Sequence, residues 1–300
     1  MERERQAVAR LEALESDDGL LVEDAFAARA SALEELEADI PGAVEALAVT
    51  GVPSAVVADL ARRIRRLRDR LERVDRALFA RLRDGIREGS LRGEALRRAL
   101  LSLAPPVRGA EGGYDVLDTL ISGALLDEQP PATVRPELQG WDPEMVPYQP
   151  TPARIVLELA TRLRPTVDDV FCDLGAGLGQ VCVLVHLLTG VRAVGIEVDP
   201  ALWAYSERLA RRLGLADVTF FVGDARQADL TMGTLFFLYT PFTGTLLAAV
   251  LARIGELAAR HRIRVASYGP CTSWVAREGW LMPEDAPADD PERLVLFRSR

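Results

Sequence analysis

The sequence predicts an α/β fold in which a doubly wound sheet of seven strands follows an all-α domain. Residues 1–126 are rich in Arg, Glu, Ala and Leu and contain few aromatic residues, a composition typical of helices. Beyond residue 147, short apolar runs alternate with amphipathic stretches, as in a parallel sheet covered by helices. We therefore divide the chain into a helical domain (1–126), a connector (127–147) and an α/β domain (148–300).

The composition is that of an ordinary globular protein, with 300 residues, 49% of them hydrophobic and 27% charged. The sequence has no apolar run of membrane-spanning length and no leader-like start, so we expect a cytoplasmic protein without a membrane partner. The formal charge of −9 argues against nucleic acid as a partner. The three cysteines show no CxxC spacing, which indicates neither a disulfide framework nor a metal site.

The clearest helix of the helical domain begins at the cap signal Pro53-Ser54. A second apolar series lies upstream, between Leu11 and Leu36, and is closed by Pro41-Gly42. The simplest packing of the two is an antiparallel hairpin, and the alternative is a homodimer in which these helices form a coiled coil. The first helix carries a heptad-like seam with steps of three and four: Val57, Leu60, Ile64, Leu67, Leu71, Val74, Leu78 and Leu82.

Five strands and a closing hairpin are expected in the α/β domain. The first strand, 170–173, runs into a glycine loop and a helix that stops at Gly190. Asp199-Pro200 supplies the cap and first-turn proline of the helix after the second strand, and a helix of about 245–260 follows the fourth. The remaining strands are expected at 192–198, 218–222, 235–239 and 263–268, with weaker ones at 280–282 and 294–297.

The glycine loop is the strongest sign of a ligand site. Its glycines stand at Gly175, Gly177 and Gly179, with Gln180 in the sixth position, so the spacing is GxGxG and not the GxGxxG of dinucleotide-binding folds. Asp173 precedes the loop and completes the pattern DxGxGxG. A loop without side chains exposes backbone to a ligand, and the following helix end offers unpaired N–H groups. We therefore expect the site at the carboxyl ends of the strands, where the topology reverses.

Acidic residues recur at the ends of the next two strands. Glu197 ends the second strand, and its two carboxylate oxygens suit the two hydroxyl groups of a ribose. Asp224 follows the third strand and suits an adenine amino group, while the backbone N–H of Ala225 would meet the ring. One such carboxylate is ordinarily a solvated strand end, but three in register with the loop indicate a ligand.

These motifs resemble the class I (seven-strand) S-adenosylmethionine-dependent methyltransferases, which have a Rossmann-like fold. More narrowly, Tyr148-Gln149-Pro150-Thr151-Pro152, residues 173–179 and Val194-Gly195-Ile196-Glu197 resemble the non-SET histone lysine and mitochondrial ATP-synthase c-subunit lysine methyltransferases and their bacterial relatives. The resemblance spans about residues 146–268. It implies S-adenosylmethionine as cofactor and methyl transfer to a protein side chain, such as lysine, or to a small molecule. The implied cofactor contacts are Tyr148, Thr151, Asp173, Gly175, Gly177, Gly179, Gln180, Glu197, Asp224 and Ala225.

The segment after the fourth strand departs from the amino-methylating relatives. Leu238-Tyr239-Thr240-Pro241-Phe242 has no Asn or Asp before its proline, where those relatives often hold the accepting nitrogen. Tyr239 and Thr240, with Tyr148 and Phe242, are our candidates for the methyl-acceptor pocket, and no general base is assigned. The alternative is an inactive S-adenosylmethionine-binding protein that serves assembly or regulation.

Three further predictions concern single features. Thr151 also fits a helix N-cap with Pro152 in the first turn. Tyr268, Cys271 and Trp274 either line a substrate pocket or belong to the core. The helical domain is expected to be a lid, a substrate-recruiting module or an assembly module.

Overall fold

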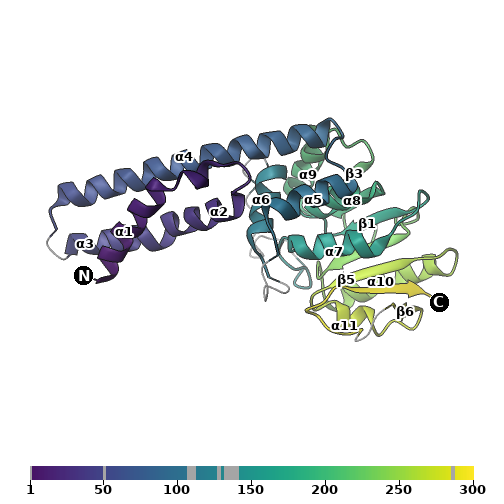
Figure 1. The fold of residues 1–300 in the computed structure, drawn as a ribbon. Helices are drawn as coiled ribbons and strands as arrows, with labels where there is room; N and C mark the ends of the chain where they lie inside the picture. Colours follow the sequence, from purple (N-terminus) through teal and green to yellow (C-terminus); the bar gives the residue numbers. More distant parts are fainter. Residues whose placement is uncertain (1, 50–51, 107–112, 127–129, 132–141, 285–287) are drawn as a thin grey trace. The chain divides into compact units, whose positions relative to one another are not determined.

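The computed structural model describes residues 2–49, 52–106, 113–126, 130–131, 142–284 and 288–300. The chain forms two compact units (Figure 1): the first comprises residues 1–84, 98–108 and 115–124, and the second residues 85–97, 109–114 and 125–300. Much of the predicted connector, 127–129 and 132–141, lies outside the described residues.

The first unit is entirely helical in its described residues, as predicted. The element that dominates it is α4, which begins at Ser54 as expected and extends to Arg87. The other helices of this part of the chain are α1 (Glu2–Ser16), the 3₁₀ helix η1 (Asp18–Leu21), α2 (Phe26–Glu34), the π-helix η2 (Glu35–Asp39), α3 (Ile40–Val49), α5 (Gly93–Leu103) and α6 (Val116–Leu125).

The predicted two-helix hairpin is too simple, because the chain does not turn at Pro41-Gly42. Helix α3 runs through both residues and ends at Val49. The proline has no N–H to donate and its ring crowds the carbonyl of the preceding turn. A π-helical turn directly before it, in which the N–H of Ile40 donates to the carbonyl of Glu35, absorbs this mismatch without ending the helix.

The seam of α4 is covered within the chain. Leu60, Ile64, Leu67 and Leu71 belong to one apolar cluster with residues of α1, η1, α2, η2 and α3. Leu78 and Leu82, further along α4, are at most 2% exposed. A coiled-coil homodimer through this seam would have to displace the chain's own helices, so the structure does not support that alternative.

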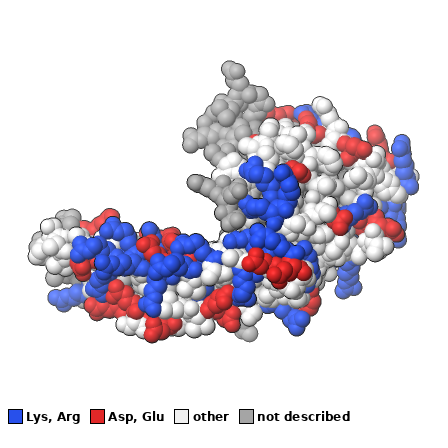
Figure 2. Space-filling view, turned by 90° about the horizontal axis from the view of Figure 1, so that it is seen from above, with Lys and Arg blue, Asp and Glu red and all other residues white. Residues whose placement is uncertain are grey.

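In this unit, the helices before residue 50 are mainly acidic, and α4, which packs against them, is mainly basic. Residues 2–49 contain 13 acidic residues against 4 Arg, whereas α4 contains 11 Arg against 5 acidic residues. Figure 2 shows the Arg side chains along α4 with acidic side chains beside them. Ion pairs between these helices and α4 include Arg63 with Glu15 (2.5 Å) and the buried pair of Arg29 with Asp75 (2.6 Å). Part of the arginine run of α4 therefore pairs with the preceding segments, as Arg63 and Arg81 do, and part pairs with acidic residues of α4 itself, as Arg62 does with Asp59.

The second unit contains a seven-stranded sheet with the order β3-β2-β1-β4-β5-β7-β6. The first five strands are parallel, and β7 runs antiparallel to both β5 and β6. The doubly wound α/β fold and its closing hairpin are therefore as predicted. The strands are β1 (Val170–Leu174), β2 (Arg192–Glu197), β3 (Val218–Val222), β4 (Leu235–Tyr239), β5 (Arg264–Tyr268), β6 (Leu281–Pro283) and β7 (Val295–Ser299).

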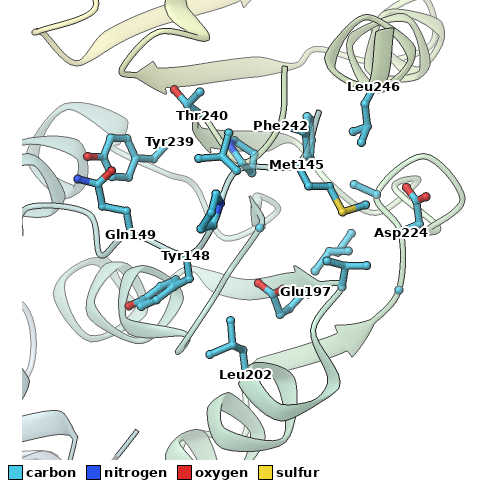
Figure 3. A pocket seen from close by; sticks show the side chains of 18 of the residues that line it. Met145, Tyr148, Gln149, Glu197, Leu202, Asp224, Tyr239, Thr240, Phe242 and Leu246 are labelled. Carbon is cyan, nitrogen blue, oxygen red and sulfur yellow. The ribbon is translucent and has the colours of Figure 1, made fainter. Parts of the chain in front are cut away.

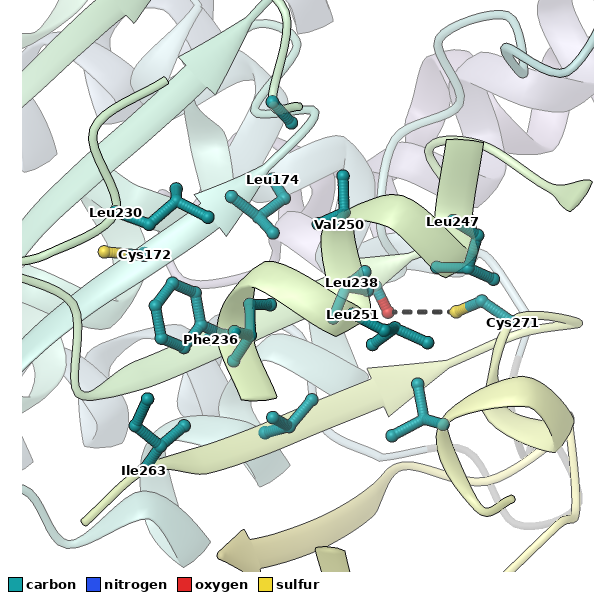
Figure 4. Packing of buried hydrophobic residues seen from close by; sticks show 14 of the residues in the cluster. Cys172, Leu174, Leu230, Phe236, Leu238, Leu247, Val250, Leu251, Ile263 and Cys271 are labelled. Atoms are coloured by element: carbon teal, nitrogen blue, oxygen red, sulfur yellow. Dashed lines mark hydrogen bonds between the residues drawn. The ribbon is translucent and has the colours of Figure 1, made fainter. Parts of the chain in front are cut away.

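Helices cover both faces of the sheet. Alternate strand residues such as Cys172, Leu174 and Phe236 form one core with the inner face of α10 (Figure 4). Helices α8 and α9 connect β1 to β2 and β2 to β3, and Asp199 caps α9 as predicted by accepting a hydrogen bond from Ala201 N (2.7 Å). The helices of this unit are α7 (Ala153–Leu163), α8 (Gln180–Thr189), α9 (Pro200–Arg212), α10 (Gly244–Ala258) and α11 (Thr272–Val275). Among the described residues, none of the helices combines the length and the apolarity needed to cross a membrane.

Candidate functional site

A cavity of about 200 Å³ opens at the carboxyl ends of β1, β2 and β4 (Figure 3). This is the edge of the sheet where the sequence predicted a site. In Figure 3, Asp224 and Tyr239 lie toward opposite ends of the cavity, and Glu197 lies between them. The predicted residues that line it are Tyr148, Gly175, Glu197, Asp224, Ala225, Tyr239, Thr240 and Phe242.

The glycine loop takes a conformation that suits only glycine. Gly175, Gly177 and Gly179 have φ values of 86°, 53° and 79°. A Cβ atom on Gly177 would lie 2.1 Å from Cε2 of Tyr148, so the Tyr148 ring fills the space that a side chain would need. Gly177 and Gly179 are not among the lining residues, although Gly175 is.

Glu197 joins the end of β2 to the glycine loop. Its Oε2 accepts a hydrogen bond from the N–H of Gly177 at 2.7 Å, and its Oε1 accepts one from the N–H of Asp199 at 2.8 Å. Burial raises the pKa of this carboxyl, and hydrogen bonds from the backbone, those of Asp199 and Gly177 foremost, oppose that shift. Glu197 also lines the cavity, so its carboxylate lies where a ligand hydroxyl could reach it.

Asp173 lies behind the lining of the cavity and is 4% exposed. Burial, and then the charge of Glu197, raise the pKa of its carboxyl from 3.8 to about 8. A second carboxylate so close to Glu197 is stable only with a proton or a nearby cation. The pair would therefore favour a cationic ligand.

Asp224 is engaged in a way that the sequence did not reveal. Its Oδ2 accepts hydrogen bonds from Nε of Arg226 at 2.9 Å and from Nη2 of Arg226 at 2.6 Å, and its Oδ1 accepts one from the N–H of the same residue. The Arg226 guanidinium lowers the pKa of this carboxyl. An adenine amino group would therefore have to share Asp224 with Arg226.

The segment before α7 closes one side of the cavity. The N–H of Val146 donates to the carbonyl of Pro241 at 3.0 Å, and Met145 forms an isolated β-bridge with Phe242. The Tyr148 hydroxyl donates to Oε1 of Gln180 at 3.4 Å, and burial raises the pKa of Tyr148. This contact brings two predicted residues, Tyr148 and Gln180, together.

Sequence reasoning missed the role of Glu144, which fastens this segment to α10. Oε2 of Glu144 accepts hydrogen bonds from the N–H of Leu246 at 2.7 Å and from the hydroxyl of Thr245 at 2.8 Å. The first N–H groups of a helix have no partner within it, and a carboxylate from elsewhere can satisfy them. Nothing in the spacing of Glu144 and Thr245 signals this contact, because they are far apart in the sequence.

The predicted N-cap at Thr151 is wrong, since α7 begins at Ala153 and its N-cap is Pro152. The first hydrogen bonds of the helix run from the N–H groups of Ile155 and Val156 to the carbonyl of Pro152, so the helix starts one residue later than a cap at Thr151 requires. Pro152 itself has a ψ of 131° and stays outside the helix. Thr151 is also not among the residues that line the cavity, so its proposed cofactor contact has no geometric support here.

The end of β4 forms the opposite side of the cavity. The Tyr239 ring packs against Tyr268, with ring centroids 5.1 Å apart, and burial raises the pKa of Tyr239. Thr240 has a φ of 40°, which is a left-handed conformation. Tyr268, Cys271 and Trp274, for which the sequence allowed either a pocket or a core position, do not line the cavity. Tyr268 and Cys271 are buried, and Trp274 is 41% exposed.

The described residues contain no cluster of side chains suited to a metal centre. In the described part of the chain, no three His, Cys, Asp or Glu side chains are grouped so that they could hold a metal ion. Nδ1 of His186 lies 2.8 Å from the carbonyl of Val191, a structural contact at the end of α8.

No protein-family model and no curated protein matches this chain. Solved structures similar to this chain include an RNA methyltransferase from Salinibacter ruber in complex with S-adenosyl-L-homocysteine. The two sequences are 26% identical, the match covers 50% of this chain and 92% of that chain, and the TM-score is 0.39. A precorrin-6y C5,15-methyltransferase from Geobacter metallireducens GS-15 has 16% identity and a TM-score of 0.40 over 53% and 94% of the two chains. A geranyl diphosphate C-methyltransferase from Streptomyces coelicolor A3(2), in complex with Mg²⁺, geranyl diphosphate and S-adenosyl-L-homocysteine, has 16% identity and a TM-score of 0.37 over 50% and 77%.

Proposed function

We propose that this chain binds S-adenosylmethionine in the cavity described above and works as a methyltransferase. The observation that carries this proposal is the 2.7 Å hydrogen bond from Gly177 N to Glu197. It joins the side-chain-free loop of the DxGxGxG pattern to the acidic end of the next strand. A crevice at a topological switch point, with largely apolar walls and a carboxylate from Glu197, suits an adenosyl ligand that carries a positive charge.

The residues present fit this cofactor. The glycine loop offers backbone at close approach, Glu197 would accept from the ribose hydroxyls, and Asp224 with Ala225 would meet the adenine. Tyr148 would face the methionine part, and Asp173 would act on it from behind the lining of the cavity. Burial raises the pKa of Asp173 to about 8, and a cationic ligand nearby would compensate that unfavourable charge.

When bound, S-adenosylmethionine supplies a methyl group that its sulfonium has already made electrophilic. The chain's part is then to exclude water and to align an acceptor, for which Tyr148, Tyr239 and Phe242 provide the walls. The pKa of both tyrosines is raised, so their phenols stay neutral and take no proton near pH 7. A protonated acceptor would therefore lose its proton to solvent, and we expect turnover of an amine to rise with pH.

The acceptor is proposed to be a protein side chain, such as lysine, or a small molecule. The resemblance to lysine methyltransferases favours the first. The position of the Thr240 hydroxyl favours a small molecule as acceptor. This hydroxyl accepts a hydrogen bond from the N–H of Cys271 at 3.1 Å and lies 3.5 Å from the carbonyl of Tyr268. It is thus turned toward β5 and is not offered to an amine in the cavity.

An inactive S-adenosylmethionine-binding protein is the second candidate. It is favoured by the neutral walls of the acceptor end, where no described lining side chain is suited to take a proton.

Calorimetry with S-adenosylmethionine, followed by incubation of the full chain with labelled cofactor and a cell lysate, separates the methyltransferase from the inactive binding protein. Label in the protein or small-molecule fraction supports the enzyme, binding without label supports the inactive protein, and absence of binding refutes both.

The sequence helps this experiment because its 36 basic residues are all Arg. Labelled lysine found in the protein fraction would therefore belong to another protein and not to this chain. Asp173→Ala and Glu197→Ala serve as controls. Each is expected to weaken cofactor binding by about 1–3 kcal/mol through lost charge-assisted hydrogen bonds.

The helical domain, residues 1–126, is proposed to act as a lid, a substrate-recruiting module or an assembly module. Sedimentation of the full chain tests the assembly role. A particle larger than the 32.8 kDa monomer supports it, and a monomer at all concentrations contradicts it.

A further inference from the structure

Thr240 holds a backbone conformation that threonine avoids. Its φ of 40° is shared by one other described non-glycine residue, Arg164, which ends helix α7, where left-handed residues are common. For a β-branched residue outside a helix end such a conformation is an outlier, because the branched side chain crowds its own backbone. It persists only when the surrounding structure imposes it.

Cys271 and Thr240 are joined by hydrogen bonds in both directions. The N–H of Thr240 donates to Sγ of Cys271 at 3.4 Å, and the N–H of Cys271 donates to Oγ1 of Thr240 at 3.1 Å. Each residue thus uses one backbone and one side-chain group to hold the other. We call these paired hydrogen bonds the Thr240–Cys271 clamp.

The thiol is itself fixed on its other side. It lies 3.6 Å from the carbonyl of Leu238 (Figure 4) and 3.5 Å from that of Tyr268, and both distances are those of a sulfur hydrogen bond. Cys271 is 1% exposed, and burial raises the pKa of its thiol, so it remains neutral. A neutral thiol can donate to a carbonyl while it accepts from Thr240, which a buried alanine cannot do.

The residue after Thr240 touches two other walls of the cavity. A Cβ atom on Gly175 would lie 2.4 Å from Cβ of Pro241, so Pro241 is packed against the glycine loop. The carbonyl of Pro241 accepts the 3.0 Å hydrogen bond from Val146, which leads to Tyr148. A change of φ at Thr240 would therefore move Pro241 away from both walls.

We propose that Cys271 is a positioning residue for the methyl-transfer end of the cavity. Through the clamp it holds Thr240 in the left-handed conformation, and Thr240 in turn sets Pro241 between the glycine loop and the Tyr148 segment. This inference rests on the proposed function, because the wall that it orders is the one that would face the methionine part of the cofactor. Glu197 and Asp224, which would hold the adenosine part, do not contact the clamp.

The test compares Cys271→Ala with Cys271→Ser and with a matched control, Cys172→Ala. Cys172 is also a buried free cysteine of the same core, 2% exposed, but it takes no part in the clamp. Two properties of each variant are measured: φ of Thr240 in a crystal structure, and the calorimetric affinities for S-adenosylmethionine and for adenosine.

Cys271→Ala is expected to return φ of Thr240 to negative values and to weaken S-adenosylmethionine binding about tenfold, the factor for one lost hydrogen bond. Adenosine affinity should stay unchanged, and Cys271→Ser and Cys172→Ala should behave like the wild type. A purely structural role would instead weaken both ligands alike. Should Cys271→Ala not fold, Thr240→Val breaks the other half of the clamp and is expected to show the same selective loss.

The proposal is overturned if φ of Thr240 stays positive in Cys271→Ala, or if S-adenosylmethionine and adenosine are affected equally. A rescue experiment adds a check: glycine adopts a left-handed φ without help, so Thr240→Gly combined with Cys271→Ala should recover part of the lost affinity. If the wild type binds neither ligand, the proposed function fails, whereas the crystal structure of Cys271→Ala still decides whether the clamp exists.

Discussion

Replacing Glu197 by Gln tests whether this carboxylate ties the glycine loop to the sheet. Glu197 is 6% exposed and receives two backbone N–H groups, from Gly177 at 2.7 Å and from Asp199 at 2.8 Å. Glutamine preserves the shape but exchanges one oxygen for an NH₂ group, so in either orientation of the amide one of the two N–H groups loses its acceptor. A buried donor left unpaired costs about 1–3 kcal/mol.

We therefore expect urea unfolding to show a free energy of unfolding about 1–3 kcal/mol lower for Glu197→Gln than for the wild type. Calorimetry should show S-adenosylmethionine affinity about 5- to 150-fold weaker, the equivalent of the same energy range. The difference in stability should shrink at low pH, because a protonated Glu197 resembles glutamine. Its pKa is raised by burial, which brings this change closer to neutral pH.

The matched control is Asp217→Asn, an exposed carboxylate that directly precedes β3, at the edge of the sheet opposite to Glu197. It should change neither the stability nor the affinity. If Glu197→Gln is as stable as this control and binds the cofactor as tightly as the wild type, then the hydrogen bonds of Glu197 are not what organises the loop, and the reasoning from them is wrong.

Three further predictions concern other parts of the chain. The pKa of Asp173 is raised from 3.8 to about 8 in the folded protein, so the folded protein binds a proton at Asp173 more tightly than the unfolded chain does. The stabilisation from this proton is full below about pH 4 and is lost as the pH rises through 8. Urea midpoints should therefore fall from pH 6 to pH 9 in the wild type and fall less in Asp173→Asn. Gly177→Ala would place a methyl group 2.1 Å from the ring of Tyr148 at a residue whose φ is 53°. We therefore expect the free energy of unfolding to fall by at least about 1–2 kcal/mol and cofactor binding to weaken. A variant that matches the wild type in both measurements would contradict this packing. Arg29→Met would leave Asp75 buried without its 2.6 Å partner and should lower the free energy of unfolding of the helical unit by about 3–5 kcal/mol. The control is Arg62→Met, on the exposed face of α4, which should have little effect in the same thermal or urea unfolding experiment. Equal stabilities of the two variants would show that the buried pair is not needed.

The strands of the α/β domain were predictable because each is a short apolar run between clear breakers. The third and fourth strands match the predicted residues 218–222 and 235–239, and the others differ by one or two residues at their ends. The glycine loop was equally clear, since strand, glycines and helix follow one another within a few residues. Local sequence therefore carried most of the information about where the site lies.

Two of the wrong predictions failed for different reasons: one local signal was overridden by the turn before it, and one helix face was covered by segments far away in the sequence. Pro41-Gly42 is an ordinary helix-ending signal, yet a π-helical turn at residues 35–39 lets the helix continue toward Val49. The seam of α4 is equally suited to a partner copy and to the chain's own helices, and only the folded unit shows that the latter cover it. Periodicity describes the face of a helix, but it does not say what covers that face.

The sequence by itself determined the order of the strands and the positions of Asp173, Glu197 and Asp224 at successive strand ends, because these features follow from local propensity and from the regular geometry of parallel strands. Only the tertiary structure decided what each carboxylate contacts: Glu197 receives Gly177, and Asp224 is taken by Arg226. It alone revealed the left-handed Thr240 and its bonds to Cys271, 31 residues further along the chain. Contacts of this kind arise from the closure of the fold, in which strand ends that are remote in sequence are brought within hydrogen-bonding distance.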